Sequence, residues 1–195
     1  MDISSLVEWA RRESKLGNPA LEKYASEGHG SFIDLCLKWS KAVNESIRDM
    51  VHGISPFPLV NECLEAIQGK ADTIVVSQTP LEALEREWKE NKIDTRVRFI
   101  AGQEYGTKTE HLKYAASGKY RPEKMLMIGD APGDLKAAES NHTLFFPVNP
   151  GHEEKSWYRL HKEGLEKFFN GTFKGSYQES LLKEFEKYLP ERPSW

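Results

Sequence analysis

The sequence predicts an α/β protein with a parallel sheet, preceded by a helical segment and followed by two more helices. Residues 1 to about 70 carry apolar residues at helical spacing and no strand-like run. After residue 70, short apolar runs alternate with amphipathic stretches, which is typical of a parallel sheet with right-handed crossovers. From about residue 153 to residue 189, two amphipathic stretches flank a polar, glycine-containing break at 170–175.

Helix-start residues and the spacing of apolar residues predict the N-terminal helices. Leu6, Trp9 and Ala10 mark a short amphipathic helix, and Asn18-Pro19 is a typical helix start. The clearest helix covers residues 31–51, where apolar side chains recur at helical spacing: Phe32, Leu35, Cys36, Trp39, Val43, Ile47 and Met50. Gly53 to Pro58 ends this pattern, and a further helix carries Leu59, Val60, Leu64 and Ile67. We interpret these stripes as core and helix contacts rather than as a cofactor site.

Four short segments are expected to be strands. Thr73–Val76 is apolar and β-branched at consecutive positions, which indicates a strand buried on both faces. Val97–Ile100, Met125–Ile128 and Thr143–Phe146 are the other candidates. A helix is expected after each of the first three strands, over about residues 81–89, 108–116 and 132–140. In the tail, we expect the aromatic residues to pack the last two helices onto the core, although they could instead form an interaction surface: Trp157, Tyr158, Phe168, Phe169, Phe173 and Tyr177.

Composition excludes several classes of protein. Hydrophobic residues make up 38% and charged residues 29% of the 195 residues, as in a folded globular protein rather than a disordered one. The formal net charge of −3 does not suggest a nucleic-acid-binding protein. No apolar run is long enough to span a bilayer, and the N-terminus lacks a signal layout, so we expect a cytoplasmic protein without a membrane partner. Cys36 and Cys63 have no metal-ligand spacing and are read as buried thiols.

Polar residues follow three of the expected strands. Ser77 and Gln78 follow the first strand, Lys108 follows the second, and Asp130 and Asp134 follow the third. Taken singly, each has an ordinary explanation, because the serine and an aspartate could only cap helices and the lysine could be a solvated surface residue. Their order along the chain favours a common binding site over these separate roles, because each group follows its own strand and ligands of open α/β sheets bind at the carboxyl ends of the strands.

Together these residues predict a phosphoryl-transfer site. A hydroxyl and backbone N–H groups at a helix start suit a phosphate, and an ammonium group balances its charge, so we expect Ser77, Gln78 and Lys108 to bind the phosphate. A pair of carboxylates, here Asp130 and Asp134, suits Mg²⁺, which prefers oxygen ligands. The expected partner is therefore a small phosphorylated metabolite, with Mg²⁺ as the cofactor.

The same segments resemble a known family. The sequences at Val75–Pro80 (VVSQTP), Gly106–Leu112 (GTKTEHL) and Met127–Asp134 (MIGDAPGD) resemble the second, third and fourth motifs of the haloacid dehalogenase (HAD) superfamily. The resemblance covers about residues 57 to 150. It implies a Rossmann-like core over residues 56–195, including the two C-terminal helices, and a helical cap over residues 1–55.

The resemblance also implies roles. Ser77 would bind the transferring phosphoryl group, Lys108 would neutralise that group and the nucleophile, and Asp130 with Asp134 would hold Mg²⁺. In some members only one of these acids touches the metal, and we expect it to be Asp130. Phosphomonoester hydrolysis is the usual activity, and dehalogenase and phosphonatase chemistries use the same scaffold.

One family motif is missing from these 195 residues. The first motif is a strand that ends in Asp-x-Asp and supplies the nucleophile and the general acid/base. The only distant candidate, Asp34, lies within the strongest helical pattern and has no second acid two positions later. In the family the missing strand lies between the strands that end here at Ser77 and Gly129. Its loss predicts either a gap that something fills or direct pairing of those two strands.

Three hypotheses follow from this absence. The chain is an N-terminally incomplete hydrolase whose start lies upstream, a non-catalytic HAD-like binding or interaction protein, or one half of a split enzyme whose first motif comes from another chain. For all three, we expect no phosphatase turnover from these residues alone.

Overall fold

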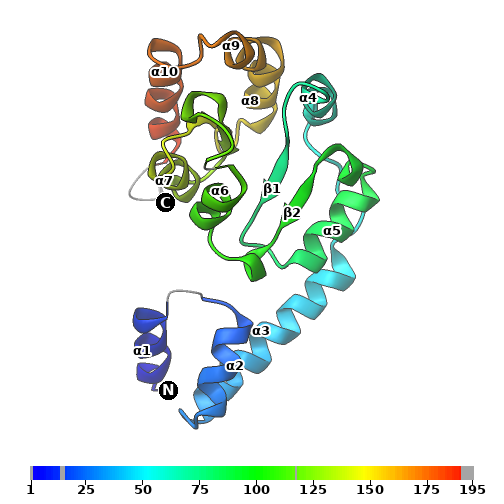
Figure 1. Ribbon diagram of the computed structural model, residues 1–195. Coiled ribbons are helices and arrows are strands. Elements are labelled where there is room, and N and C mark those ends of the chain that lie inside the picture. Colours follow the sequence, from blue (N-terminus) through cyan, green and yellow to red (C-terminus); the bar gives the residue numbers. More distant parts are fainter. Residues whose placement is uncertain (1, 14–15, 117, 190–195) are drawn as a thin grey trace. The chain divides into compact units, whose positions relative to one another are not determined.

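The computed structural model describes residues 2–13, 16–116 and 118–189. The chain divides into two compact units, Met1–His52 and Gly53–Trp195 (Figure 1). Each unit is described by itself below. In the described residues, no helix is both long and apolar enough to cross a membrane.

The first unit is helical. It contains α1 (Ser4–Arg12), α2 (Asn18–Ser26) and α3 (Ser31–Met50), with α3 packed against both shorter helices. Leu21 of α2 and Ile33 of α3 are its buried apolar residues. The helices lie where the periodicity predicts them, and Pro19 lies in the first turn of α2. Asn18 was expected as the cap of α2, but it is the first helical residue, and the N-cap is Gly17, which makes no side-chain capping hydrogen bond.

The second unit alternates strands and helices, as the sequence predicts. Its elements in chain order are α4 (Val60–Ile67), β1 (Ile74–Val76), α5 (Leu81–Glu90), β2 (Phe99–Ala101), α6 (Lys108–Ala116), β3 (Leu126–Gly129), α7 (Pro132–Ser140), β4 (Leu144–Pro147), α8 (Glu153–Arg159), α9 (Leu165–Asn170) and α10 (Ser176–Phe185). A π-helical segment, Leu160–Gly164, joins α8 to α9. The predicted α/β class is confirmed.

Each strand begins later than predicted, by one residue for β1, β3 and β4 and by two residues for β2. The β2 strand covers Phe99–Ala101 instead of Val97–Ile100, because a 3₁₀ turn at Asp94–Arg96 delays entry into the sheet. The partly buried Val97 packs against a small cluster that contains Ile93. The apolar character of Val97 therefore reflects packing beneath the turn rather than membership of the strand.

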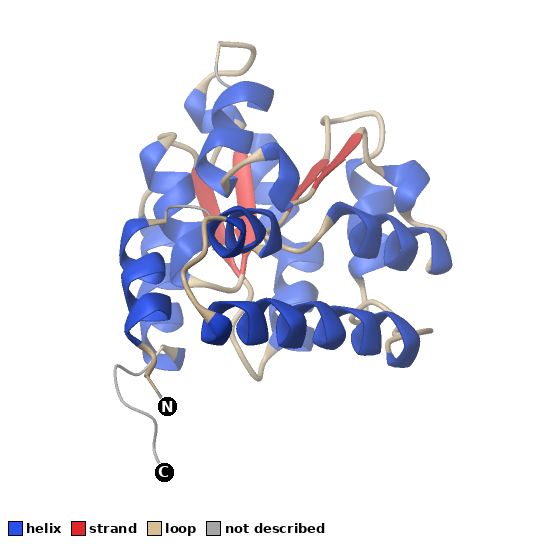
Figure 2. Cartoon of the chain, turned by 90° about the horizontal axis from the view of Figure 1, so that it is seen from below, coloured by secondary structure: helices blue, strands red, loops and turns tan. Residues whose placement is uncertain are grey.

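The strands form two separate parallel pairs. In one pair Val75 of β1 lies opposite Ile100 of β2, and in the other Ile128 of β3 lies opposite Phe146 of β4. No strand pairing joins β1 to β3 in the described part of the chain (Figure 2). Of the two outcomes expected from the missing motif, direct pairing of β1 with β3 is therefore the wrong one.

Helices cover both faces of the β3–β4 pair. Met127 and Phe145 belong to a cluster that includes residues of α6, α7 and α10. Leu126, Ile128 and Phe146 pack in another cluster, which contains residues of α4, α8 and α9. Alternate side chains of each strand thus enter opposite cores, which explains why these strands are apolar at consecutive positions.

The tail packs as expected for core structure. Phe168, Phe173 and Phe185 are buried, and Trp157 and Tyr177 pack against the cluster of α4, α8 and α9. Burial raises the pKa of the Tyr177 phenol to about 12. These contacts favour the packing interpretation of the tail aromatics over an interaction surface, although Tyr158 remains exposed.

Candidate functional site

The first loop of the site follows β1. The Ser77 amide donates to the carbonyl of Ala101, which continues the β1–β2 pairing by one residue. The Ser77 hydroxyl oxygen accepts a hydrogen bond from the Thr79 amide at 3.1 Å. Because this bond uses an oxygen lone pair, the hydroxyl proton is left to donate to a bound anion.

A second loop carries Lys108 at the start of α6. Gly106 has a φ of +122°, a backbone conformation that favours glycine, and places the chain for entry into the helix. Glu110 Oε2 accepts hydrogen bonds from both the amide and the hydroxyl of Thr107, at 2.8 and 2.9 Å. The start of α6, and with it the backbone of Lys108, is therefore held by its own first turn.

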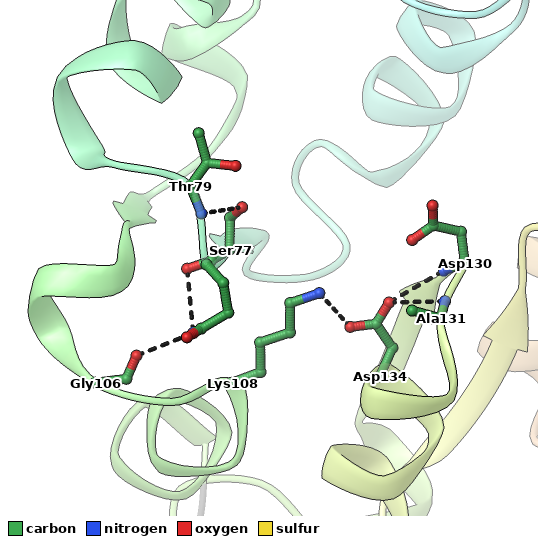
Figure 3. A network of polar contacts seen from close by, with 8 residues as sticks. Ser77, Thr79, Gly106, Lys108, Asp130, Ala131 and Asp134 are labelled. Atoms are coloured by element: carbon green, nitrogen blue, oxygen red, sulfur yellow. Dashed lines mark hydrogen bonds and ion pairs between the residues drawn. The ribbon is translucent and has the colours of Figure 1, made fainter. Parts of the chain in front are cut away.

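The two loops are tied to each other. Gln78 Nε2 donates to the carbonyl oxygen of Gly106 at 3.1 Å (Figure 3). Gln78 was predicted to help bind phosphate, and here its side-chain amide instead connects the serine loop to the lysine loop. Its place as a phosphate ligand stays a prediction.

The third loop is organised by Asp134, which is only 2% exposed. Its Oδ2 accepts hydrogen bonds from the amides of Asp130 and Ala131 at 3.1 and 3.2 Å. Its Oδ1 is paired with Lys108 Nζ (Figure 3). One buried carboxylate thus fixes the loop after β3 and links it to α6.

The two aspartates consequently occupy different environments. Both carboxylate oxygens of Asp134 are engaged by protein donors, whereas Asp130 is exposed. The Asp130 carboxylate makes no hydrogen bond or ion pair with the described residues and points away from Asp134 (Figure 3). Asp130 is therefore the more accessible candidate ligand for a cation, and direct metal ligation by Asp134 stays a prediction.

The donor set at this site offers Mg²⁺ few protein ligands. The described part of the chain contains no group of three or more His, Cys, Asp or Glu side chains that could hold a metal ion. Mg²⁺ nevertheless often binds through one or two carboxylates, several waters and a substrate phosphate. Asp130 fits this type of site, in which the phosphate completes the ligand set.

The ammonium group of Lys108 has donors left with which to bind an anion. Its side chain is 25% exposed, and an ammonium group carries three donors, of which Asp134 Oδ1 accepts one hydrogen bond. The Asp134 charge is also shared with two backbone amides. The lysine can therefore hold its position through Asp134 and still donate toward a phosphate.

The sequence prediction did not include three residues that lie at or beside this site: Glu104, Glu110 and His111. The T-x-x-E pattern from Thr107 to Glu110 is a capping-box signature and could have been recognised. Glu104 Oε2 accepts from the Leu81 amide at 3.0 Å and so satisfies a donor at the start of α5, a contact between loops that no local pattern indicates. His111, one turn after Lys108, is buried, and burial lowers the pKa of its imidazole.

One comparison with known proteins assigns a family to the chain. A family model described as haloacid dehalogenase-like hydrolase matches residues 14–148, which is more than half of the chain. The comparisons with curated proteins and with solved structures find no match.

Proposed function

Because the chain belongs to the haloacid dehalogenase-like hydrolase family, we propose that its site binds the phosphoryl group of a small phosphorylated metabolite. Phosphomonoester hydrolysis is the reaction that this site would serve. The observation that supports the proposal is the convergence of three loops, in which Gln78 ties the serine loop to the lysine loop and Asp134 ties Lys108 to the loop of Asp130.

Each loop would supply a different interaction. The Ser77 hydroxyl would donate to a phosphate oxygen, because its own oxygen already accepts from the Thr79 amide and its proton remains free to donate. Lys108 would donate from its ammonium group and balance negative charge. Asp134 would act through Lys108 as a positioning residue.

Mg²⁺ is the cofactor we propose, with Asp130 as the side chain of this chain that would hold it. The ion would supply positive charge against the phosphate oxygens when bound. Asp134 would contribute by fixing the loop of Asp130 through the hydrogen bonds that its carboxylate accepts from two backbone amides of that loop.

The sequence of 195 residues contains no Asp-x-Asp. Without that carboxylate no aspartyl-phosphate forms, so we propose binding without turnover by these residues alone. A non-catalytic HAD-like binding protein and one half of a split enzyme both fit this behaviour.

Binding is tested by isothermal titration of the full chain with phenyl phosphate, with and without Mg²⁺. We expect saturable binding that Mg²⁺ strengthens and that Ser77→Ala, Lys108→Met and Asp130→Asn each weaken at least tenfold. Matched controls are Ser180→Ala, Lys113→Met and Glu139→Gln, which change exposed residues of α10, α6 and α7. Equal losses in a variant and its control would contradict the assignment of that residue.

Turnover is tested with p-nitrophenyl phosphate and Mg²⁺ on the purified chain. We expect no activity above that of the Ser77→Ala and Asp130→Asn variants. Clear hydrolysis that disappears in both variants would show that a nucleophile operates within these residues and that the proposal of binding alone is wrong.

A further inference from the structure

A cavity in the second unit lies away from the three loops of the candidate site. Its volume is about 400 Å³, and it is lined by segments that precede β1, β2 and β3 in the chain: residues 68–73, residues 95–98 and Tyr120. β1 and β2 are parallel, and the Arg98 amide donates to the Thr73 carbonyl at 2.8 Å where the two strands begin. The cavity therefore lies at the amino ends of these strands, whereas Ser77 follows the carboxyl end of β1.

The lining of this cavity is mostly polar and carries an excess of positive charge. Lys70, Arg96 and Arg98 are cationic, and Asp72 is the one acidic residue among the described residues that line it. The Arg96 side chain is only 24% exposed, and its guanidinium pairs with Glu65 at 2.8 Å. Lys70 and Arg98 are therefore the cations that remain for a ligand.

Asp72 holds Arg98 by one edge of its guanidinium. The Asp72 carboxylate pairs with Arg98 Nε through Oδ1 and accepts a hydrogen bond from the Tyr120 hydroxyl at Oδ2. The Arg98 side chain is 74% exposed, so its two terminal nitrogens still reach solvent. These nitrogens form a planar fork that matches the two oxygens of a carboxylate. Arg98 is thus oriented by Asp72 and keeps an accessible edge for a bidentate contact.

Lys70 is placed by a separate segment of the lining. The turn after α4 contains Gly69, which has a φ of +74°, and the Lys70 amide donates to the Ile67 carbonyl at 2.9 Å. The Lys70 ammonium group lies 5.5 Å from the centre of the Phe169 ring. An aromatic face attracts the charge without occupying all three of its donors. The cavity thus has two cationic groups that are held by different partners and can each contact a ligand.

We propose that this cavity binds a small organic dicarboxylate. One carboxylate would accept two hydrogen bonds from the terminal nitrogens of Arg98, and the other would accept from Lys70. A ligand with a single acidic group would leave one of these two cations unmatched. The volume of the cavity falls within the range of about 300 to 1,000 Å³ that is typical of pockets for small organic molecules.

The test is a titration of the full chain with succinate at about pH 7.5, where both carboxylates of this probe are ionised, without phosphate or Mg²⁺. Amide chemical shifts report the cavity and the candidate phosphoryl site separately, so either proposal can fail alone. We expect saturable shifts at Gly69, Thr73 and Arg98 with one common dissociation constant of about 1 mM. The amides of Thr79 and Lys108 should stay unchanged.

Variants of Arg98 test the bidentate contact. Arg98→Leu should weaken succinate binding at least tenfold, because it removes both the charge and the fork. Arg98→Lys keeps the charge without the planar fork and should weaken binding severalfold. Arg121→Leu is the matched control, because Arg121 is exposed and adjacent to Tyr120 but lies outside the lining of the cavity. It should change the affinity by less than about twofold.

A second probe tests the role of Lys70. Propionate has one carboxylate fewer than succinate, so it should bind the native chain at least about fivefold more weakly. Lys70→Met should remove that difference, because the second carboxylate then has no cationic partner. Lys113→Met, which changes an exposed lysine of α6, should preserve it.

Several results would overturn the proposal. No shifts at the three amides up to about 50 mM succinate would show that the cavity does not bind a dicarboxylate. Equal losses in Arg98→Leu and Arg121→Leu would show that the probe responds to positive charge in general rather than to Arg98. Equal affinities for propionate and succinate, or tighter binding of inorganic phosphate at the same amides, would show that the ligand class is wrong.

Discussion

Replacing Asp134 with alanine would remove the group that holds two parts of the site together. The residue is 2% exposed, and its carboxylate accepts hydrogen bonds from two backbone amides at 3.1 and 3.2 Å and pairs with Lys108. Each partly buried amide that loses its acceptor costs about 1 kcal/mol, and the lost ion pair costs about another 1 kcal/mol because Lys108 is partly exposed and can rehydrate. The expected loss is about 3 kcal/mol. Asp134→Asn keeps one acceptor oxygen and should lose roughly half as much.

Native-state hydrogen exchange of the β4 amides is the suitable assay, because it reports the opening of the second unit alone. A loss of about 3 kcal/mol corresponds to exchange roughly 100-fold faster at amides that require global opening of this unit. Phe146 lies opposite Ile128 in the β3–β4 pair and is 1% exposed, so its amide is a good reporter. Glu139→Ala, at an exposed site on the same helix, should change stability by less than about 0.5 kcal/mol.

Equal changes of the Phe146 exchange rate in Asp134→Ala and Glu139→Ala would show that the contacts of Asp134 do not stabilise the second unit. If Asp134→Asn were as stable as the native chain, the ion pair between Asp134 and Lys108 would contribute nothing to stability.

Three further predictions concern neighbouring residues. A Cβ on Gly129 would lie 2.5 Å from the side chain of Asp134, so Gly129→Ala should cost about 3 kcal/mol in urea unfolding, whereas Gly133→Ala has open space and should be neutral or slightly stabilising. Burial lowers the pKa of His111 below the ordinary value of about 6.5, so the unfolded state binds more protons. Stability should therefore fall as the pH drops below about 6.5, and a His111→Gln variant with the same pH slope as the native chain would contradict this. Gln78→Leu should leave stability within about 1 kcal/mol but weaken phenyl phosphate binding severalfold, and unchanged affinity would show that the tie to the lysine loop is not needed.

The sequence predicts the elements of the second unit well because its local patterns are strong. Consecutive apolar residues at Met125–Ile128 identify a strand that contacts two cores, and the structure places β3 there. The start of α7 at Pro132 follows from the fixed φ of proline, which suits the first turn of a helix. Val97 misleads because burial beneath a 3₁₀ turn selects the same apolar residue as a strand does.

The site is predicted in part. The positions of Ser77, Lys108, Asp130 and Asp134 after successive strands follow from the order of the elements. The different environments of the two aspartates do not, because only the fold shows that Asp134 is enclosed by Lys108 and two backbone amides. The contact from Gln78 to Gly106 is likewise a long-range contact between two loops, and no local pattern indicates it.

If the three loops form one phosphoryl-binding site, their backbone amides should respond together to phosphate. Amide chemical shifts of the full chain, recorded during titration with inorganic phosphate in the presence of Mg²⁺, measure this response. We predict saturable shifts at Thr79, Lys108 and Ala131, one residue from each loop, with a single common dissociation constant that weakens together in Ser77→Ala. Shifts confined to one loop, different constants for the three amides, or no shifts at about 10 mM phosphate would contradict the claim.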